Sequence, residues 1–152
     1  MRAFLRFVTR ASFAWLALAG VPRTMPAQYG PRGEHIARVV ADCGARADEF
    51  QRAFRHALAH SGYRGTLRQE DLDRRADALA HSMARVREVW NRERDAGRTR
   101  RYVEDAIRVS REINRVMNNN RFYAELHRQW AALREELNRL AEAFDLPRLR
   151  WD

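Results

Sequence analysis

The amino-acid sequence predicts an all-α protein, an antiparallel up-down-up-down four-helix bundle that follows a cleaved signal peptide. Residues 1–27 combine a basic start with a short apolar run, as export signals do. After residue 33, apolar residues recur at alternating spacings of four and three, the pattern of coiled-coil-like packing on one helix face. No segment alternates apolar and polar residues as a half-buried strand does.

Charge and hydropathy together indicate export. Three arginines and no acidic residue precede an uncharged apolar run over residues 11–21. That run is too short to span a bilayer, which takes about 20 apolar residues. Cleavage after Ala27, at Met25-Pro26-Ala27, gives the better spacing, and cleavage after Ala19, at Ala17-Leu18-Ala19, is the alternative. We therefore expect an exported protein, periplasmic or secreted.

The first helix is predicted over residues 34–60. Residues 28–33 contain Pro and Gly and are expected to form a flexible lead-in. The apolar stripe of the helix is spaced 4-3-4-3-4-3 and consists of Ile36, Val40, Cys43, Ala47, Phe50, Phe54 and Ala57. Gly44 inside this helix costs about 1 kcal/mol relative to Ala, and it could permit a close approach by a neighbouring helix.

The second helix follows a turn over residues 61–65. Thr66 and Gln69 have the spacing of a capping box, in which the Thr side chain accepts from a free backbone N–H and the Gln reaches back to the cap. The stripe of this helix is spaced 4-3-4-3-4 and consists of Leu72, Ala76, Leu79, Met83, Val86 and Trp90. Gly97 is predicted to end the helix, and Thr99 to cap the next one.

The last two helices complete the predicted bundle over residues 34–146. The third has a broad apolar face, made of Val103, Ile107, Ser110, Ile113 and Met117 and widened by Ala106, Val109 and Val116. Three asparagines at 118–120 predict a turn. The fourth helix carries Leu126, Trp130, Leu133, Leu137, Leu140 and Phe144. Residues 147–152 form a tail whose Leu149 and Trp151 could fold back on the bundle.

Short connections make consecutive helices antiparallel neighbours. One bundle of four helices would bury all four stripes within a single chain. An extended pair of hairpins that completes its core by dimerising would bury them as well. Periodicity alone does not separate these two arrangements.

The charge balance does not indicate a nucleic-acid surface. All 29 basic residues are arginine, and cleavage after Ala27 would remove four of them and leave 25 arginines against 20 acidic residues. The two signs are mixed along the helices, which is typical of a solvated surface laced with salt bridges. A nucleic-acid site would gather basic residues on one face.

Cys43 is the single cysteine, so an internal disulfide is impossible. Its place on the first apolar stripe predicts a small, buried core residue. In an oxidising compartment, an intermolecular bridge is the alternative interpretation.

His56 and His60 are the candidate metal ligands. They are one helical turn apart, so both imidazoles lie on one face, a spacing that zinc and copper sites use. Asp71, Asp73 or Asp77 on the second helix could supply a carboxylate across the hairpin turn, and Asp73 is taken as the candidate third ligand. Both histidines flank the apolar stripe on its polar side. We therefore favour two solvated surface side chains over a metal site, because such sites need a full set of ligands.

No catalytic or cofactor-binding constellation is found in the sequence. Paired Glu-x-x-His motifs and a C-x-x-C-H motif are absent, and Met83 and Met117 are interpreted as core residues rather than haem ligands. Adjacent acids on a helix diverge by about 100°, so Glu135 is expected to pair with Arg139 one turn away. We expect no enzymatic activity and no cofactor.

The aromatic residues have two expected roles. Trp90 and Trp130 lie at core spacing, which predicts packing. Tyr63, Phe122 and Tyr123 lie near helix ends. Packing that closes the end of the bundle is the preferred interpretation, with a small recognition patch as the alternative.

A resemblance covers the span from residue 113 to residue 146. It is carried by Ile113-Asn114-Arg115, Trp130-x-x-Leu133-Arg134-x-x-Leu137-Asn138-x-Leu140-Ala141 and Phe144-x-Leu146. This C-terminal third resembles small exported bacterial helical-bundle proteins that remain uncharacterised. The resemblance implies export and a helical bundle, and it implies neither an activity nor functional residues.

The leading functional hypothesis is a non-enzymatic envelope protein that binds another protein or itself through helical surfaces. A chaperone-like variant would need an exposed apolar face. The first alternative is a carrier of a metal or small ligand, although no small molecule is identified. The second is association with a membrane surface through Arg148-Leu149-Arg150-Trp151, the one short candidate segment beyond the signal peptide.

Overall fold

The structure, a computed structural model, describes residues 30–150 and contains four α-helices. They are α1 (Pro31–Ala59), α2 (Leu67–Glu93), α3 (Ala96–Asn119) and α4 (Ala124–Ala143). No strand occurs within residues 30–150, so the prediction of an all-α protein with four helices is confirmed. The predicted export signal, both cleavage positions and Trp151 lie outside the described residues.

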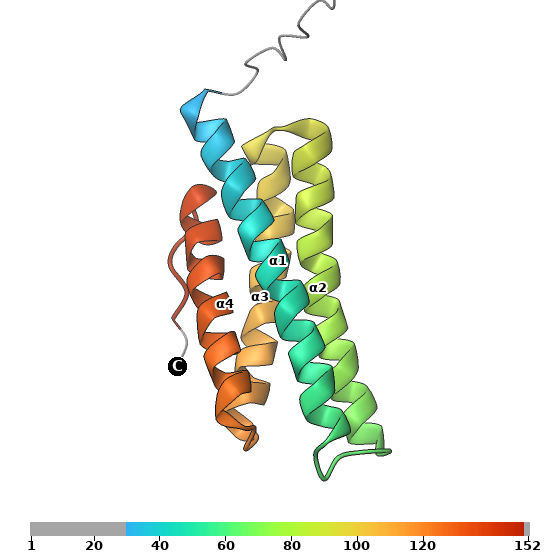
Figure 1. The fold of residues 1–152 in the computed structure, drawn as a ribbon. Helices are drawn as coiled ribbons and strands as arrows, with labels where there is room; N and C mark the ends of the chain where they lie inside the picture. The colour runs from blue at the N-terminus through green and yellow to red at the C-terminus, as the bar shows by residue number, and fades with distance from the viewer. Residues whose placement is uncertain (1–29, 151–152) are drawn as a thin grey trace, which may run out of the picture.

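The four helices form one elongated bundle in which the connections alternate between its two ends (Figure 1). α1 packs against both α2 and α4, and α2 packs against α3. The backbones of α3 and α4 approach each other at far fewer positions. None of the helices within the described range is long and apolar enough to cross a membrane.

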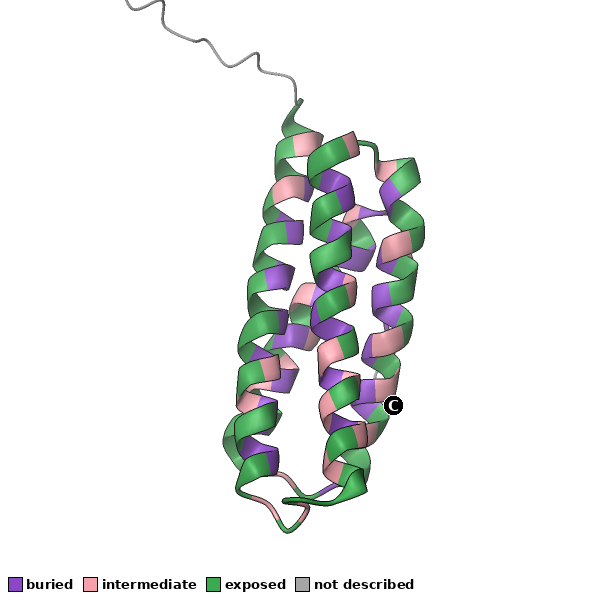
Figure 2. Cartoon of the chain, turned by 90° about the vertical axis from the view of Figure 1, so that its right-hand side faces the viewer, coloured by how far each residue is buried: buried purple, intermediate pink, exposed green. Residues whose placement is uncertain are grey.

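The core contains every residue of the predicted stripes of α1, α2 and α4 and the whole principal stripe of α3. These positions face the interior along the length of the bundle (Figure 2). Trp90 and Trp130 are each 2% exposed, which confirms that both pack inside. Because one chain covers all four stripes, dimerisation is not needed to complete the core.

The first two helices start at well-defined caps. α1 begins at Pro31, three residues earlier than predicted, because proline tolerates the first helical position, where its missing N–H needs no partner. The helix therefore takes in the second half of the expected lead-in. At α2, Thr66 Oγ1 accepts from Gln69 N at 3.2 Å, as predicted. The Gln69 side chain instead accepts from Gly65 N at 2.7 Å, one residue before the cap.

The connection between α2 and α3 differs from the prediction. Arg94 ends α2 in the left-handed conformation (φ 52°), and Asp95 caps α3 by accepting from Arg98 N at 2.9 Å. Gly97 lies inside the first turn of α3. Thr99 is fully buried and donates its hydroxyl to the Asp95 carbonyl at 2.8 Å. Aspartate caps helix N-termini at least as well as threonine does, so Asp95 forms the cap in place of Thr99, four residues later.

Asn120 joins the end of α3 to the α1–α2 connection. The helix continues through Asn119, so only the last of the three asparagines leaves it. The Asn120 Oδ1 accepts from the Tyr63 hydroxyl and from Arg68 Nη2, both at 3.0 Å, and its Nδ2 donates to the Val116 carbonyl at 2.7 Å. Tyr63 therefore serves the packing of this end of the bundle, as preferred from the sequence.

Gly44 provides a stability prediction. A Cβ at this position would meet only Arg87 Nη1, at 3.8 Å, which is an ordinary contact with the end of a flexible side chain. The expected close approach of a helix backbone is therefore not what the structure has. We expect Gly44→Ala to raise the free energy of unfolding by about 1 kcal/mol because alanine is the better helix former. Urea unfolding measures it, with Ala45→Gly on the exposed side as the opposite control. A loss of stability would contradict the prediction.

Candidate functional site

The metal hypothesis places His56 and His60 in the last turn of α1 and Asp73 in α2. The two imidazole rings stack with centroids 4.3 Å apart, and His60 Nδ1 lies 2.8 Å from the His56 carbonyl oxygen. Both histidines are exposed. Among residues 30–150, no group of three or more His, Cys, Asp or Glu side chains is arranged to hold a metal ion. Asp73 therefore does not join the histidine pair.

Cys43 is a core residue, as predicted. It is fully buried, and its Sγ lies 3.9 Å from Met83 Sδ on α2. Burial raises the pKa of the Cys43 thiol well above its usual range, and the negative charges of Glu136 and Asp42 raise it further. The thiol therefore stays protonated and is not a nucleophile.

We expect alkylation of native Cys43 by iodoacetamide to be at least about 100-fold slower than alkylation in urea, because the thiolate is the reactive form. Because the folded protein favours the protonated thiol, Cys43 makes a pH-dependent contribution to the free energy of unfolding. This contribution is fully present below the unfolded-state pKa of about 8.5, and it is lost as the pH rises toward the folded-state pKa. Quenched alkylation followed by mass spectrometry measures both rates. Equal rates in the native and urea-unfolded protein would contradict the buried position.

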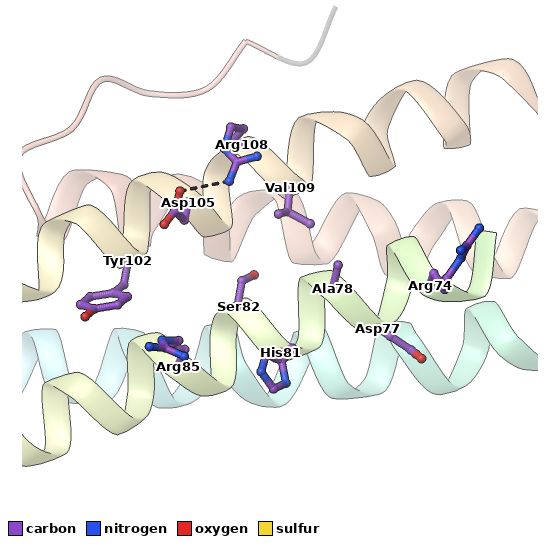
Figure 3. Close-up of a pocket in the computed structure, with 10 residues that line it drawn as sticks. All are labelled: Arg74, Asp77, Ala78, His81, Ser82, Arg85, Tyr102, Asp105, Arg108 and Val109. Atoms are coloured by element: carbon purple, nitrogen blue, oxygen red, sulfur yellow. Dashed lines mark hydrogen bonds and ion pairs between the residues drawn. The ribbon is translucent and has the colours of Figure 1, made fainter. Parts of the chain in front are cut away.

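A hollow opens between α2 and α3 near their middle. It has a volume of about 640 Å³. Ala78, Ser82 and Val109 lie between the two helices, and Tyr102 reaches from α3 toward Arg85 of α2 (Figure 3). The remaining lining residues are charged or ionisable: Arg74, Asp77, His81, Asp105 and Arg108. We call this space the central hollow.

Two further hollows continue the same seam. Toward the α2–α3 connection, a hollow of about 380 Å³ shares Tyr102 with the central hollow and includes Arg98 and Arg101. Toward the opposite end, a hollow of about 320 Å³ is lined by Arg68, Asp71, Leu72, Arg75, Glu112, Arg115, Val116, Asn119 and Asn120. The three hollows together make up the α2–α3 groove.

The carboxylates of the groove are satisfied from within the protein. Asp77 accepts from Arg55 Nη2 at 2.6 Å and from Gln51 Nε2 at 2.8 Å, both on α1. Asp105 pairs with Arg108 at 3.1 Å, and Asp71 pairs with Arg75 at 2.9 Å. These acids are therefore already neutralised by neighbouring guanidinium groups.

The two arginines beside Tyr102 are the exception to this charge pairing. The Arg101 guanidinium lies 4.6 Å from the centre of the Tyr102 ring and donates to its hydroxyl at 2.6 Å. The Arg85 guanidinium lies 5.7 Å from the same ring. Neither arginine forms an ion pair with any carboxylate of residues 30–150. Two positive groups thus converge on one aromatic ring without a carboxylate of residues 30–150 at ion-pairing distance.

Apolar surface is scarce over the described range. Leu67 is 83% exposed and Tyr123 is 45% exposed, and no other large hydrophobic residue within 30–150 is exposed. The two lie in different elements and do not form a broad face. The exposed apolar surface that a chaperone-like protein would need is therefore missing from this part of the chain.

The sequence did not predict the α2–α3 groove. Arg85, Arg101 and Tyr102 come from two helices, and their meeting depends on which helices are neighbours and at what register. The one available indication was an arginine that lacks an acidic residue three or four positions away. Arg85 does not meet this condition, because Glu88 lies three positions away. In the structure Glu88 pairs with Arg92 instead, so sequence spacing did not single out Arg85.

Comparison of the chain with protein-family models, with curated proteins and with solved structures found no match.

Proposed function

We propose that the chain is an exported, non-enzymatic protein, an antiparallel up-down-up-down four-helix bundle, that acts by binding a protein partner in the α2–α3 groove. One observation carries this proposal. The apolar stripes are buried in the core, whereas the groove presents arginine side chains that have no carboxylate partner in the described part of the chain. A partner would therefore be recognised by polar and charged contacts.

Part of the segment proposed for membrane association is buried. Leu149 is only 6% exposed, its N–H donates to Asn138 Oδ1 at 2.9 Å, and Arg148 pairs with Glu142 at 2.7 Å. A leucine held in this way is not available for insertion between lipid headgroups. The protein-binding hypothesis is therefore the better supported of the two.

The ligand-carrier alternative has one observation in its favour. The volume of the central hollow falls in the range of pockets for small molecules, about 300–1,000 Å³. Native mass spectrometry of the protein recovered from the envelope of an exporting host separates the two hypotheses. We expect a mature N-terminus at Gln28 and no bound small molecule. A stoichiometric ligand mass would favour the carrier, and a retained residue 1 would contradict export with cleavage.

Position-specific photo-crosslinking tests the protein-binding proposal itself. A photoreactive phenylalanine analogue replaces Ala78, which is exposed in the central hollow, or Ala45, which is exposed on α1 outside the groove. After irradiation of the exporting host, we expect a defined protein adduct from position 78 and none from position 45. Identical adducts from both positions, or none from either, would contradict the proposal.

A further inference from the structure

We propose that the partner segment held in the α2–α3 groove is acidic, and that its carboxylates bind at two anchor points. One lies where the central hollow meets the hollow toward the α2–α3 connection, and the other lies in the hollow at the opposite end. This inference rests on the proposed function and specifies the chemistry of the partner. The first anchor is Arg85 and Arg101 around Tyr102. The second is Arg68 and Arg115 in the hollow beside Asn120.

The first anchor presents donors that the protein does not use. A guanidinium has five N–H donors in a fixed fork, and its strongest partner is a carboxylate or phosphate bound through two of them. The Arg85 guanidinium lies beside the Tyr102 ring and forms no hydrogen bond or ion pair with residues 30–150, and Arg101 uses one donor for the tyrosine hydroxyl. An incoming carboxylate would therefore reduce the repulsion between two guanidinium groups and gain charge-assisted hydrogen bonds.

The second anchor has the same composition. The Arg68 guanidinium lies 5.2 Å from the centre of the Tyr63 ring and donates to Asn120 Oδ1. Arg115 is exposed on α3 in the same hollow. Neither residue forms an ion pair with a carboxylate of residues 30–150. Each anchor thus combines a tyrosine ring with arginines that form no ion pair with a carboxylate of residues 30–150.

The distance between the anchors sets the length of the partner. Arg68 and Arg85 both lie on α2, and the rise of about 1.5 Å per residue places them about 25 Å apart. An extended segment covers that distance in about eight residues. One small anion would reach only one anchor, so the arrangement favours a chain that carries at least two carboxylates.

The acids between the anchors argue for a protein segment over the other polyanions. Asp71, Asp77 and Asp105 line the groove beside its arginines. A nucleic-acid backbone carries a charge on every unit, and between the anchors Arg74, Arg75 and Arg108 are already paired with acids of the protein. Most of its phosphates would therefore find no unpaired guanidinium. A membrane surface is flat and is held by basic residues together with exposed apolar ones, which this seam lacks. A protein segment can place its carboxylates at the two ends alone.

The test uses a fluorescein-labelled peptide of about twelve residues, with two glutamates at each end and glycine and serine between them, long enough to reach both anchors in extended form. Fluorescence anisotropy at low ionic strength measures its affinity for the full-length mature protein. We expect Arg85→Gln/Arg101→Gln to weaken binding at least tenfold, since the variant removes both guanidinium groups that would form charge-assisted hydrogen bonds with the glutamate carboxylates. The matched control is Arg38→Gln/Arg87→Gln. It removes the same charge from two exposed arginines outside the groove, and we expect a change below about twofold from weak long-range attraction.

Four results would overturn this inference. Equal weakening by the two double variants would mean that only net charge attracts the peptide. Equal affinity for a glutamate trimer would mean a single anion site. Tighter, groove-dependent binding to phosphatidylglycerol vesicles would assign the surface to a membrane. No peptide binding, together with a protein adduct from position 78, would leave the proposed function standing and reject an acidic partner.

Discussion

Trp130→Ala is expected to lower the free energy of unfolding by about 4 kcal/mol, a large loss for a single substitution. Trp130 is 2% exposed, and its ring centre lies 5.1 Å from that of Phe50 on α1. Its Nε1 donates to Asn114 Oδ1 of α3 at 3.0 Å in the buried interior. Truncation would leave a cavity where α1, α3 and α4 meet and remove the donor from a buried amide oxygen. A small domain has only about 5–15 kcal/mol to lose.

A second variant separates packing from hydrogen bonding at this site. Trp130→Phe keeps a ring beside Phe50 and removes the Nε1–H, so we expect a smaller loss of about 1–3 kcal/mol for the buried acceptor that loses its donor. Leu67→Ala is the surface control, because Leu67 is 83% exposed, and its change should stay within about 0.5 kcal/mol. Urea unfolding followed by circular dichroism measures all three. Equal losses for Trp130→Ala and Leu67→Ala would contradict the placement of the indole.

The core was predictable from the sequence because it depends on periodicity alone. A stripe such as Leu126, Trp130 and Leu133 has only one way to be buried once the segment is helical. Asn114 also lies at a core position, and its pairing with Trp130 gives a buried polar contact between α3 and α4. Such a contact is specific to one alignment of the two helices.

Neighbouring residues that compete for the same role explain the wrong predictions of a helix cap and of an ion pair. Thr99 and Asp95 can both cap a helix, and the carboxylate four residues earlier forms the cap while Thr99 is buried behind it. Arg139 could reach either Glu135 or Glu136, and it pairs with Glu136 at 2.9 Å. Both spacings, three and four, bring side chains together on a helix. Sequence spacing therefore narrows such choices to two without deciding between them.

The candidate site was not predictable in the same way. The α2–α3 groove is formed by the exposed flanks of two stripes, and flanks carry no periodic pattern of their own. Which arginines lack a counter-charge depends on partners from a third helix, as when Arg55 of α1 takes Asp77. The sequence could supply the residue types at the groove but not their pairing, and it is the pairing that leaves Arg85 without a carboxylate.

Leu149→Ala is expected to lower the free energy of unfolding by about 2–3 kcal/mol, although residue 149 lies beyond the last helix. Leu149 is 6% exposed and belongs to the core, so the predicted folding back of the tail is confirmed for this residue. The sequence did not indicate its partner, Asn138, which is 7% exposed and accepts from Leu149 N at 2.9 Å.

The Leu149 and Asn138 variants should not be additive. Asn138→Ala alone is expected to cost about 1–2 kcal/mol, because the Leu149 N–H would stay buried without an acceptor. Once Leu149→Ala has released the tail, that N–H returns to water, and the loss of Asn138 costs less. The double variant should therefore be more stable than the sum of the single losses predicts. Arg150→Ala, at an exposed position of the same tail, is the control and should be neutral.

Native-state hydrogen exchange supplies an independent measurement, since a docked tail protects the Leu149 amide. Full additivity together with rapid exchange would mean that the tail does not occupy the core in solution.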